Sequence, residues 1–298
     1  MSNVLYDEPG PRARRRSLIG TLVAMAVFAV ILWMAYRRLD ERGQFDSELW
    51  YPLINPSDEQ FPVVWERLGE GLLATLTAAA LAIAFSLILG TLLGVGRLML
   101  GRVARIPFVT AIELLRGLPV IVTIFCVYAF KNYADLDISW LPGDDGLWYL
   151  VIGLTLYNSV IIAEILRAGV NSLPRGQAEA GLAIGLTSRQ TMRAIQLPQA
   201  FRTMLPALIS QLVVILKDTS LVAVLGFYIE LLRRGNLISQ VLDNAIQVLF
   251  VVALIFITLN YALSRLATWT ERRLSSSRTG TPAANTVDTG LAVNQGRH

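Results

Sequence analysis

Six long apolar runs constrain the fold of this chain more than any other feature. Four of them carry no charge, and the other two carry two charged residues each. A helix needs about 20 residues to cross the ~30 Å hydrocarbon core of a bilayer. We therefore predict an all-α, polytopic membrane protein with about six transmembrane helices. The runs cover residues 17–36, 71–96, 107–130, 146–163, 203–226 and 244–264.

Composition narrows the classes of function. Of the 298 residues, 54% are hydrophobic and 16% are charged, whereas a soluble domain carries about 25% charged residues. The one cysteine, Cys126, excludes a disulfide within the chain and a cysteine-cluster metal site. The one histidine, His298, leaves histidine-based catalysis without support. We expect a chain that is not an enzyme and holds no metal.

The P-loop motif of ATP-hydrolysing proteins is absent from the sequence. A P-loop ends in Gly-Lys followed by Ser or Thr, and neither lysine of this chain follows a glycine. ATP hydrolysis is therefore not expected in this chain.

Basic residues predict the orientation in the membrane, because cytoplasmic segments are enriched in Lys and Arg. With the N-terminus inside, sixteen basic residues fall in internal segments and seven in external ones. The first apolar run is longer than the core of a signal peptide and no A-x-A site follows it, so we interpret it as an uncleaved anchor. Both termini are predicted to be cytoplasmic, in a cell membrane. The net charge of +4 then reflects topology, and nucleic acid is not an expected partner.

A polar segment between the fourth and fifth apolar runs carries the most specific motif. Residues 177–200 read Q-A-E-A-G-L-A-I-G-L-T-S-R-Q-T-M-R-A-I-Q-L-P-Q-A. This resembles the cytoplasmic signature of ABC-importer permeases: E-A-A, three residues, Gly, nine residues and I-x-L-P. We call residues 179–198 the signature loop. The matching residues are Glu179, Ala180, Gly181 in place of the third alanine, Gly185, Ile195, Leu197 and Pro198.

The resemblance implies an architecture and a set of partners. It covers residues 65–271, which would form the transmembrane domain of a type I importer, after an added segment at 1–64 and before a tail at 272–298. In this family the signature loop docks on a separate ATP-binding subunit, present in two copies, which holds ATP and Mg. The resemblance also implies a second, related permease chain, with which this chain is expected to form a heterodimer. An external amino-acid-binding lipoprotein completes the assembly. The segment L-Y-N-S-V-I-I-A-E-I-L-R-A-G is similar to glutamate/aspartate permeases of high-GC Gram-positive bacteria.

The local sequence also predicts the shape of the signature loop. Residues 177–184 are good helix formers, and Gly185 can take the positive φ that ends a helix. Thr187, with Gln190 three residues later, predicts a capping box that starts a second helix. The result is a helix, a tight turn and a second helix, which can transmit motion as a lever.

Two pairs of opposite charges have a spacing of three residues, one inside the third apolar run and one directly after the fourth. Glu113 and Arg116 share one helix face, as do Glu164 and Arg167. Charged groups in a membrane are costly and are functional candidates by default. We expect both pairs to be mainly structural, with a direct contact to substrate as the alternative for Arg116. The segment E-L-L-R-G-L-P resembles the E-x-x-R-G-x-P motif of polar-amino-acid permeases.

The polar step in the fifth apolar run is the clearest candidate for a substrate path. Adjacent helical residues point about 100° apart, so Lys217 and Asp218 cannot neutralise each other across one face. A polar break within a membrane helix is where transporters place substrate contacts. The predicted path consists of Arg116, Asn158, Lys217, Asp218, Thr219 and Ser220.

Several alternatives remain open from sequence. The same importer could carry glutamine or a basic amino acid. A secondary transporter would instead use an ion gradient, with Asp218 or Glu113 titrating, and a scaffold would not transport at all. Residues 41–67 and 132–145 form long external segments that could meet a partner, and residues 275–298 are expected to be disordered.

Overall fold

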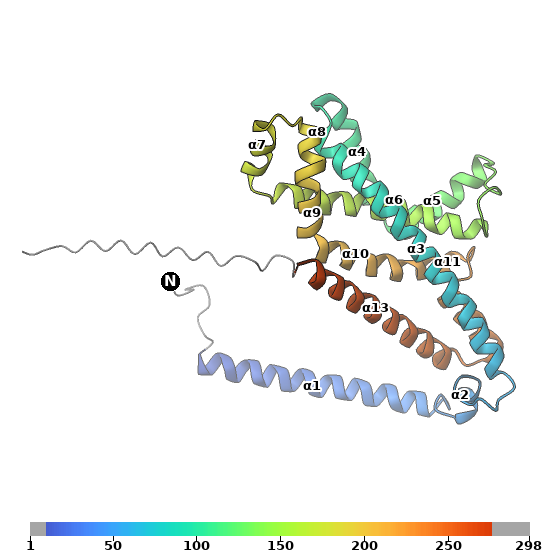
Figure 1. Ribbon diagram of the computed structural model, residues 1–298. Helices are drawn as coiled ribbons and strands as arrows, with labels where there is room; N and C mark the ends of the chain where they lie inside the picture. Colours follow the sequence, from blue (N-terminus) through green and yellow to red (C-terminus); the bar gives the residue numbers. More distant parts are fainter. Residues whose placement is uncertain (1–9, 276–298) are drawn as a thin grey trace, which may run out of the picture. The chain divides into compact units, whose positions relative to one another are not determined.

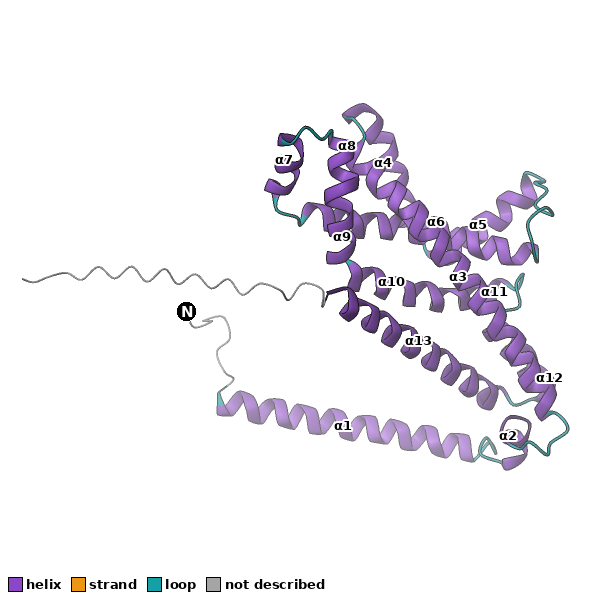
Figure 2. Cartoon of the chain, in the orientation of Figure 1, coloured by secondary structure: helices purple, strands orange, loops and turns teal. Residues whose placement is uncertain are grey.

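The structure is a computed structural model that describes residues 10–275, with side chains up to residue 270. All regular elements in this range are helices (Figure 1, Figure 2). Five helical segments are long and apolar enough to cross a membrane, and one bent pair can supply a sixth span. The prediction of an all-α protein with about six spans is therefore confirmed.

The membrane-crossing segments have the following limits. They are α1 (Pro11–Asp40), α3 (Phe61–Met99), α6 (Asp145–Asn171), α10 with α11 (Leu205–Asp218 and Val222–Leu225), and α13 (Ala245–Ser275). The bent pair consists of α4 (Arg102–Gly117) and α5 (Val120–Tyr133). The remaining helices are α2 (Ser47–Ile54), α7 (Arg175–Ala183), α8 (Ser188–Thr191), α9 (Leu197–Thr203) and α12 (Leu231–Leu242). Helix α13 runs to Ser275, so it continues past the domain boundary predicted at residue 271. The rest of the predicted tail, residues 276–298, lies outside the described residues.

The third predicted span is not one straight helix. The sequence predicts a helix over 107–130, whereas α4 and α5 meet at a bend of 108°. Pro119 is the physical cause, because it has no N–H to donate and disfavours helical geometry at the residue before it. Leu118 accordingly adopts an extended backbone with φ −82° and ψ 141°.

The chain divides into two compact units, which are described separately. The first comprises Met1–Thr77 with Ser220–Phe256. Its core combines α2, α3, α12 and α13, and its buried members are Leu53, Val64, Leu68, Leu231, Ile238, Val248 and Val252. No residue of α1 is buried.

Helix α2 is a part of this unit that the sequence did not predict. The sequence predicts only that residues 41–67 form a long external segment that can meet a partner. In the structure, Trp65 Nε1 donates a hydrogen bond to the Leu53 carbonyl at 3.0 Å, and Asn244 Nδ2 donates to the Leu49 carbonyl at 3.1 Å. Leu53 is 2% exposed. The segment after the first span is therefore tied to the core of its unit.

The second unit comprises Ala78–Thr219 with Ile257–His298. Glycines allow its helices to approach closely. A Cβ atom on Gly90 of α3 would lie 2.7 Å from Ile162 of α6, and one on Gly153 of α6 would lie 2.6 Å from the Cα atom of Ile124 in α5. Helix α6 is thereby packed against α3 and α5, and it leads at its C-terminal end into the signature loop.

Candidate functional site

The first arm of the signature loop is helix α7, and it ends as the sequence predicts. Gly185 has a φ of 86°, and its N–H donates to the Leu182 carbonyl at 3.0 Å. The N–H of Leu186 donates to the Gly181 carbonyl at 3.1 Å. These two bonds form the Schellman motif that ends a helix at a left-handed residue.

The second arm begins with the predicted capping box. The Gln190 N–H donates to Thr187 Oγ1 at 3.3 Å, and the Thr187 N–H donates to Gln190 Oε1 at 2.8 Å. A π-helical turn at Met192–Gln196 joins α8 to α9, and the Leu197 N–H bonds back to the Met192 carbonyl. Pro198 has no N–H, so the regular bonding ladder is interrupted directly after this turn.

The two arms lie against each other (Figure 1). Gly181 of α7 is buried, and a Cβ atom there would lie 2.8 Å from Thr191 Cγ2 and 3.0 Å from Ile195 Cδ1. This contact explains why glycine stands where the family motif has its third alanine. The opposite surface of α7 is open, since Glu179 and Ala180 are exposed and Ile184 is 76% exposed.

An apolar cluster anchors the loop on the helices that carry it. Its buried members are Val170 at the end of α6, Met192 and Ala200, and Leu98 and Met99 at the end of α3 pack against them. A cavity of ≈ 240 Å³ lies between these last residues of α3 and the inner side of α7 and α8. The loop thus has an exposed outer face and an anchored inner face.

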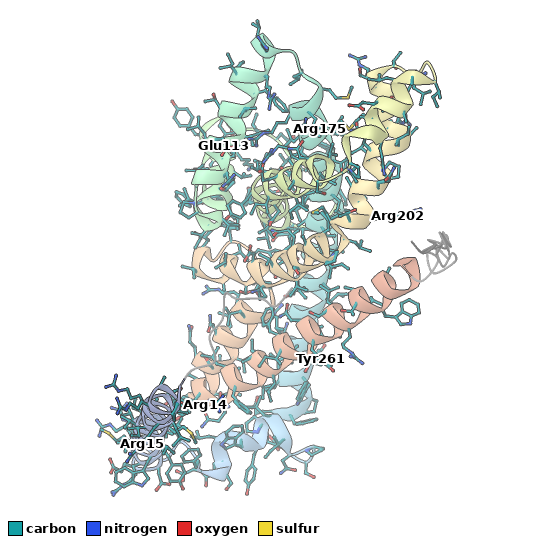
Figure 3. The ribbon with its side chains drawn as sticks, turned by 90° about the vertical axis from the view of Figure 1, so that its left-hand side faces the viewer. Arg14, Arg15, Glu113, Arg175, Arg202 and Tyr261 are labelled. Carbon is teal, nitrogen blue, oxygen red and sulfur yellow. The ribbon has the colours of Figure 1, made fainter. Side chains whose placement is uncertain are left out.

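The two predicted charge pairs form a single cluster in the structure. On α4, Arg116 Nη1 lies 3.5 Å from Glu113 Oε2. Figure 3 labels Glu113. On α6, Arg167 Nε donates a hydrogen bond to Glu164 Oε2 at 3.0 Å. Arg97 of α3 joins them, because its Nη2 donates to Glu113 Oε1 at 3.0 Å and its Nη1 donates to Glu164 Oε2 at 3.0 Å. Sequence spacing finds pairs within one helix, so it did not find Arg97.

The predicted polar break in the fifth span is present. Helix α10 ends at Asp218, and a 3₁₀ turn covers Thr219–Leu221. Thr219 is buried and donates its hydroxyl to the Leu216 carbonyl at 2.7 Å, whereas Lys217 is exposed. Ser220 is half-buried.

Asn158, the remaining candidate for the substrate path, is fully buried between α6 and α10. Its Oδ1 accepts a hydrogen bond from Gln211 Nε2 at 2.6 Å, and its Nδ2 donates to the Leu154 carbonyl at 2.8 Å. This side chain has an evident structural role, and it ties two membrane spans together.

Glu230 is a buried acid that the sequence analysis did not single out. It directly precedes α12, in the part of the sequence between the last two spans. Glu230 is fully buried, and its carboxylate accepts the N–H groups of Leu232 and Arg233 at 2.8 and 2.7 Å, which caps α12. Burial raises the pKa of Glu230 to about 7, against the opposing effect of the two hydrogen bonds. Among the described residues, no group of three His, Cys, Asp or Glu side chains could hold a metal ion.

Comparison with known proteins agrees with this geometry. Residues 82–276 match the family model of the binding-protein-dependent transport system inner membrane component. A glutamate transport system permease protein of Corynebacterium glutamicum is 42% identical over 242 residues, which cover 80% of this chain and 85% of the relative. A glutamine transport system permease protein of Escherichia coli is 34% identical over 207 residues, covering 70% of this chain and 92% of the relative.

A solved structure shows the same architecture. The crystal structure of an amino acid ABC transporter with histidines contains a chain that superposes with a TM-score of 0.63 at 27% identity. The match covers 72% of this chain and 98% of that one. Together with the family model and the permease relatives, these similarities show that this chain belongs to the family of inner-membrane components of binding-protein-dependent transport systems.

Proposed function

We propose that this chain is the membrane-spanning subunit of an ATP-driven importer for glutamate or aspartate. One observation carries the proposal: the signature loop is a helical hairpin whose outer face is exposed and whose inner face is packed on the ends of α3 and α6. A partner protein that binds the outer face and displaces the loop would thereby displace the membrane-spanning helices on which the inner face packs. The 42% identical glutamate permease supports the choice of substrate.

The proposed assembly contains more than this chain. Two ATP-binding subunits hold ATP and Mg and contact α7 around Glu179, Ala180 and Gly185 on the cytoplasmic side. A second, related permease chain forms a heterodimer with this one. An external lipoprotein delivers the amino acid. The excess of basic residues in the signature-loop segment and near both termini supports the cytoplasmic placement of the loop and of both ends.

The proposed transport step is alternating access. ATP-driven closure of the partner subunits moves the signature loop, and the two permease chains rock between inward-facing and outward-facing states. Arg116 and Lys217 supply the positive charge that would meet an acidic substrate, and both are exposed. Asp218, Thr219, Ser220 and Asn158 complete the proposed path. The irregular backbone at 219–221 supports a substrate contact there.

Mass spectrometry of the native complex tests the assembly. The chain is purified from its own membrane in mild detergent, and the proteins that copurify are identified. The proposal predicts an ATP-binding subunit, a second permease and an amino-acid-binding lipoprotein. Purification of the chain without any of them would contradict it.

Competition defines the substrate. Uptake of labelled glutamate is measured with an excess of unlabelled aspartate, glutamine or arginine. Aspartate is expected to compete most strongly. If glutamine or arginine displaced the label while aspartate did not, the same importer class would serve a different amino acid.

A further inference from the structure

Arg97 lies where three helices of one unit meet. It occupies the last turn of α3, and its side chain is 14% exposed. One end of its guanidinium group binds Glu113 of α4 at 3.0 Å, and the other binds Glu164 of α6 at 3.0 Å. A single planar group therefore ties α4 and α6 to α3.

Neither carboxylate needs Arg97 for neutralisation. Glu113 is paired with Arg116 of its own helix, and Glu164 is paired with Arg167 of its own helix. The cluster holds three positive and two negative side chains. Removing Arg97 would leave both local pairs intact and would remove the link between helices. Arg97 therefore serves to link α3 with α4 and α6, and it is not needed to neutralise the two carboxylates.

Close backbone packing sets the position of Arg97. A Cβ atom on Gly94 would lie 3.1 Å from the Ala163 carbonyl of α6, and one on Gly96 would lie 3.0 Å from the Phe108 ring of α4. The last turns of α3 are therefore in tight contact with both neighbours just before the arginine. A small shift of α3 here is transmitted to α4 and α6, since packed helices have little free volume between them.

The same turn of α3 touches the signature loop. Leu98 and Met99, the two residues after Arg97, pack on the apolar cluster of Val170, Met192 and Ala200. The end of α3 is therefore in contact with the loop through its apolar side chains and with α4 through its charged one.

We propose that Arg97 is the positioning residue that transmits a displacement of the signature loop to α4, and through the bend at Pro119 to α5. The inference rests on the proposed function, in which a partner ATPase moves the loop. An arginine suits this role because its rigid fork binds two carboxylates at once, which the single ammonium of lysine does less well.

The direct test is Arg97→Gln in the complete transporter reconstituted in liposomes. The quantity measured is substrate taken up per ATP hydrolysed. We expect this ratio to fall about tenfold, within the 5–150-fold span typical of coupling between sites, and Arg97→Lys to give a smaller fall. Arg105→Gln is the matched control, because Arg105 is an exposed arginine on α4. An unchanged ratio in Arg97→Gln would overturn the inference, whereas a structural role alone would lower the yield of complex and leave the ratio intact.

A second variant keeps the test decisive if Arg97→Gln does not assemble. Glu113→Ala removes the tie to α4 and leaves the bond between Arg97 and Glu164 in place. The Glu113 side chain is 44% exposed, so the change should not prevent folding. We expect the same loss of coupling, and a normal ratio would refute the proposed link.

A third measurement does not depend on the substrate. Cys126 is the only cysteine of the chain, is exposed and lies on α5. Its rate of maleimide labelling is compared before and after nucleotide is trapped on the ATPase with vanadate. The wild-type rate should change and the Arg97→Gln rate should not. An equal response in both proteins, or none in the wild type, would contradict the inference. A wild-type response without glutamate uptake would instead contradict the proposed substrate alone.

Discussion

Single residues determine which groups meet in this protein, and Asn158 is a clear example. Its amide is fully buried and binds both Gln211 and the Leu154 carbonyl. An amide between two spans can hold them together or face a substrate, and the two roles predict different mutant behaviour. In either role its hydrogen bonds must be satisfied, because unpaired buried polar groups cost free energy.

Asn158→Leu is predicted to destabilise the protein by about 1–3 kcal/mol, because it leaves the Gln211 amide without an acceptor. Adding Gln211→Leu should restore most of the loss, since both polar partners are then removed. Thermal melting of the purified chain in detergent measures both effects, with the exposed Asn171→Leu as control. If the double variant were no more stable than the single one, the pairing would not be the cause. Stability that returns without uptake would place Asn158 on the substrate path.

Glu230 predicts a pH dependence of stability. Its pKa of about 7 in the folded protein exceeds its ordinary value of 4.5, so the folded state binds its proton more tightly than the unfolded state. The contribution of this group is therefore most favourable below pH 4.5 and is lost as the pH rises through 7. The loss amounts to about 3 kcal/mol at pH 8.

The measurement is the melting temperature at pH 5 and pH 8 for the wild type and for Glu230→Gln. The wild type should lose more stability than the variant between these values. Glu66→Gln, a change at an exposed acid of the same unit, should behave like the wild type. Parallel curves for Glu230→Gln and the wild type would show that Glu230 is not the titrating group.

At the scale of elements, the signature loop depends on the turn between its arms. Gly185 has a φ of 86° and open space around it, so backbone geometry and not crowding requires glycine there. A side chain in this conformation costs about 1–2 kcal/mol. The turn therefore sets the angle between α7 and the second arm of the signature loop.

Gly185→Val is predicted to uncouple ATP hydrolysis from uptake without stopping membrane insertion. The control is Gly176→Ala in α7, where a Cβ atom meets no neighbour and φ is not positive. Uptake and ATP hydrolysis are measured in the same liposomes. Normal uptake by Gly185→Val would contradict the lever.

Helix α3 makes a second prediction at this scale. Gly90→Leu should destabilise the contact between α3 and α6 by about 1–3 kcal/mol or more, because the first added atom already lies 2.7 Å from Ile162. Gly69→Leu, in the same helix with open space around it, should have little effect. Thermal melting compares the two variants. Leu forms helix better than Gly, so helix propensity alone would stabilise both variants. A Gly90→Leu variant as stable as Gly69→Leu would show that close packing does not govern position 90.

The sequence predicts these elements unequally well, and the reasons are physical. The turn at Gly185 and the capping box at Thr187 were predictable, because both depend on bonds between residues close in sequence. The sharp bend at Pro119 was only partly predictable, since a proline within a span can kink it or end it. Helix α2 and the link through Arg97 depend on partners far away in sequence, and a single sequence does not show such contacts.

At the scale of the whole molecule, the family membership and the geometry of the loop lead to one account. The chain has the spans of a permease and a signature loop with an exposed outer face and a packed inner face, and its sequence contains no P-loop. The main competing account is a secondary transporter in which Asp218 or Glu113 carries protons. In the structure both carboxylate oxygens of Glu113 are paired with arginines, Oε1 with Arg97 and Oε2 with Arg116.

Uptake of labelled glutamate by the reconstituted complex tests the central claim most directly. Liposomes contain the complex with ATP enclosed, and the binding protein is added outside. The account predicts accumulation that requires both ATP and the binding protein and that persists when a protonophore removes the proton gradient. Uptake by this chain alone, independent of ATP and abolished by the protonophore, would contradict it.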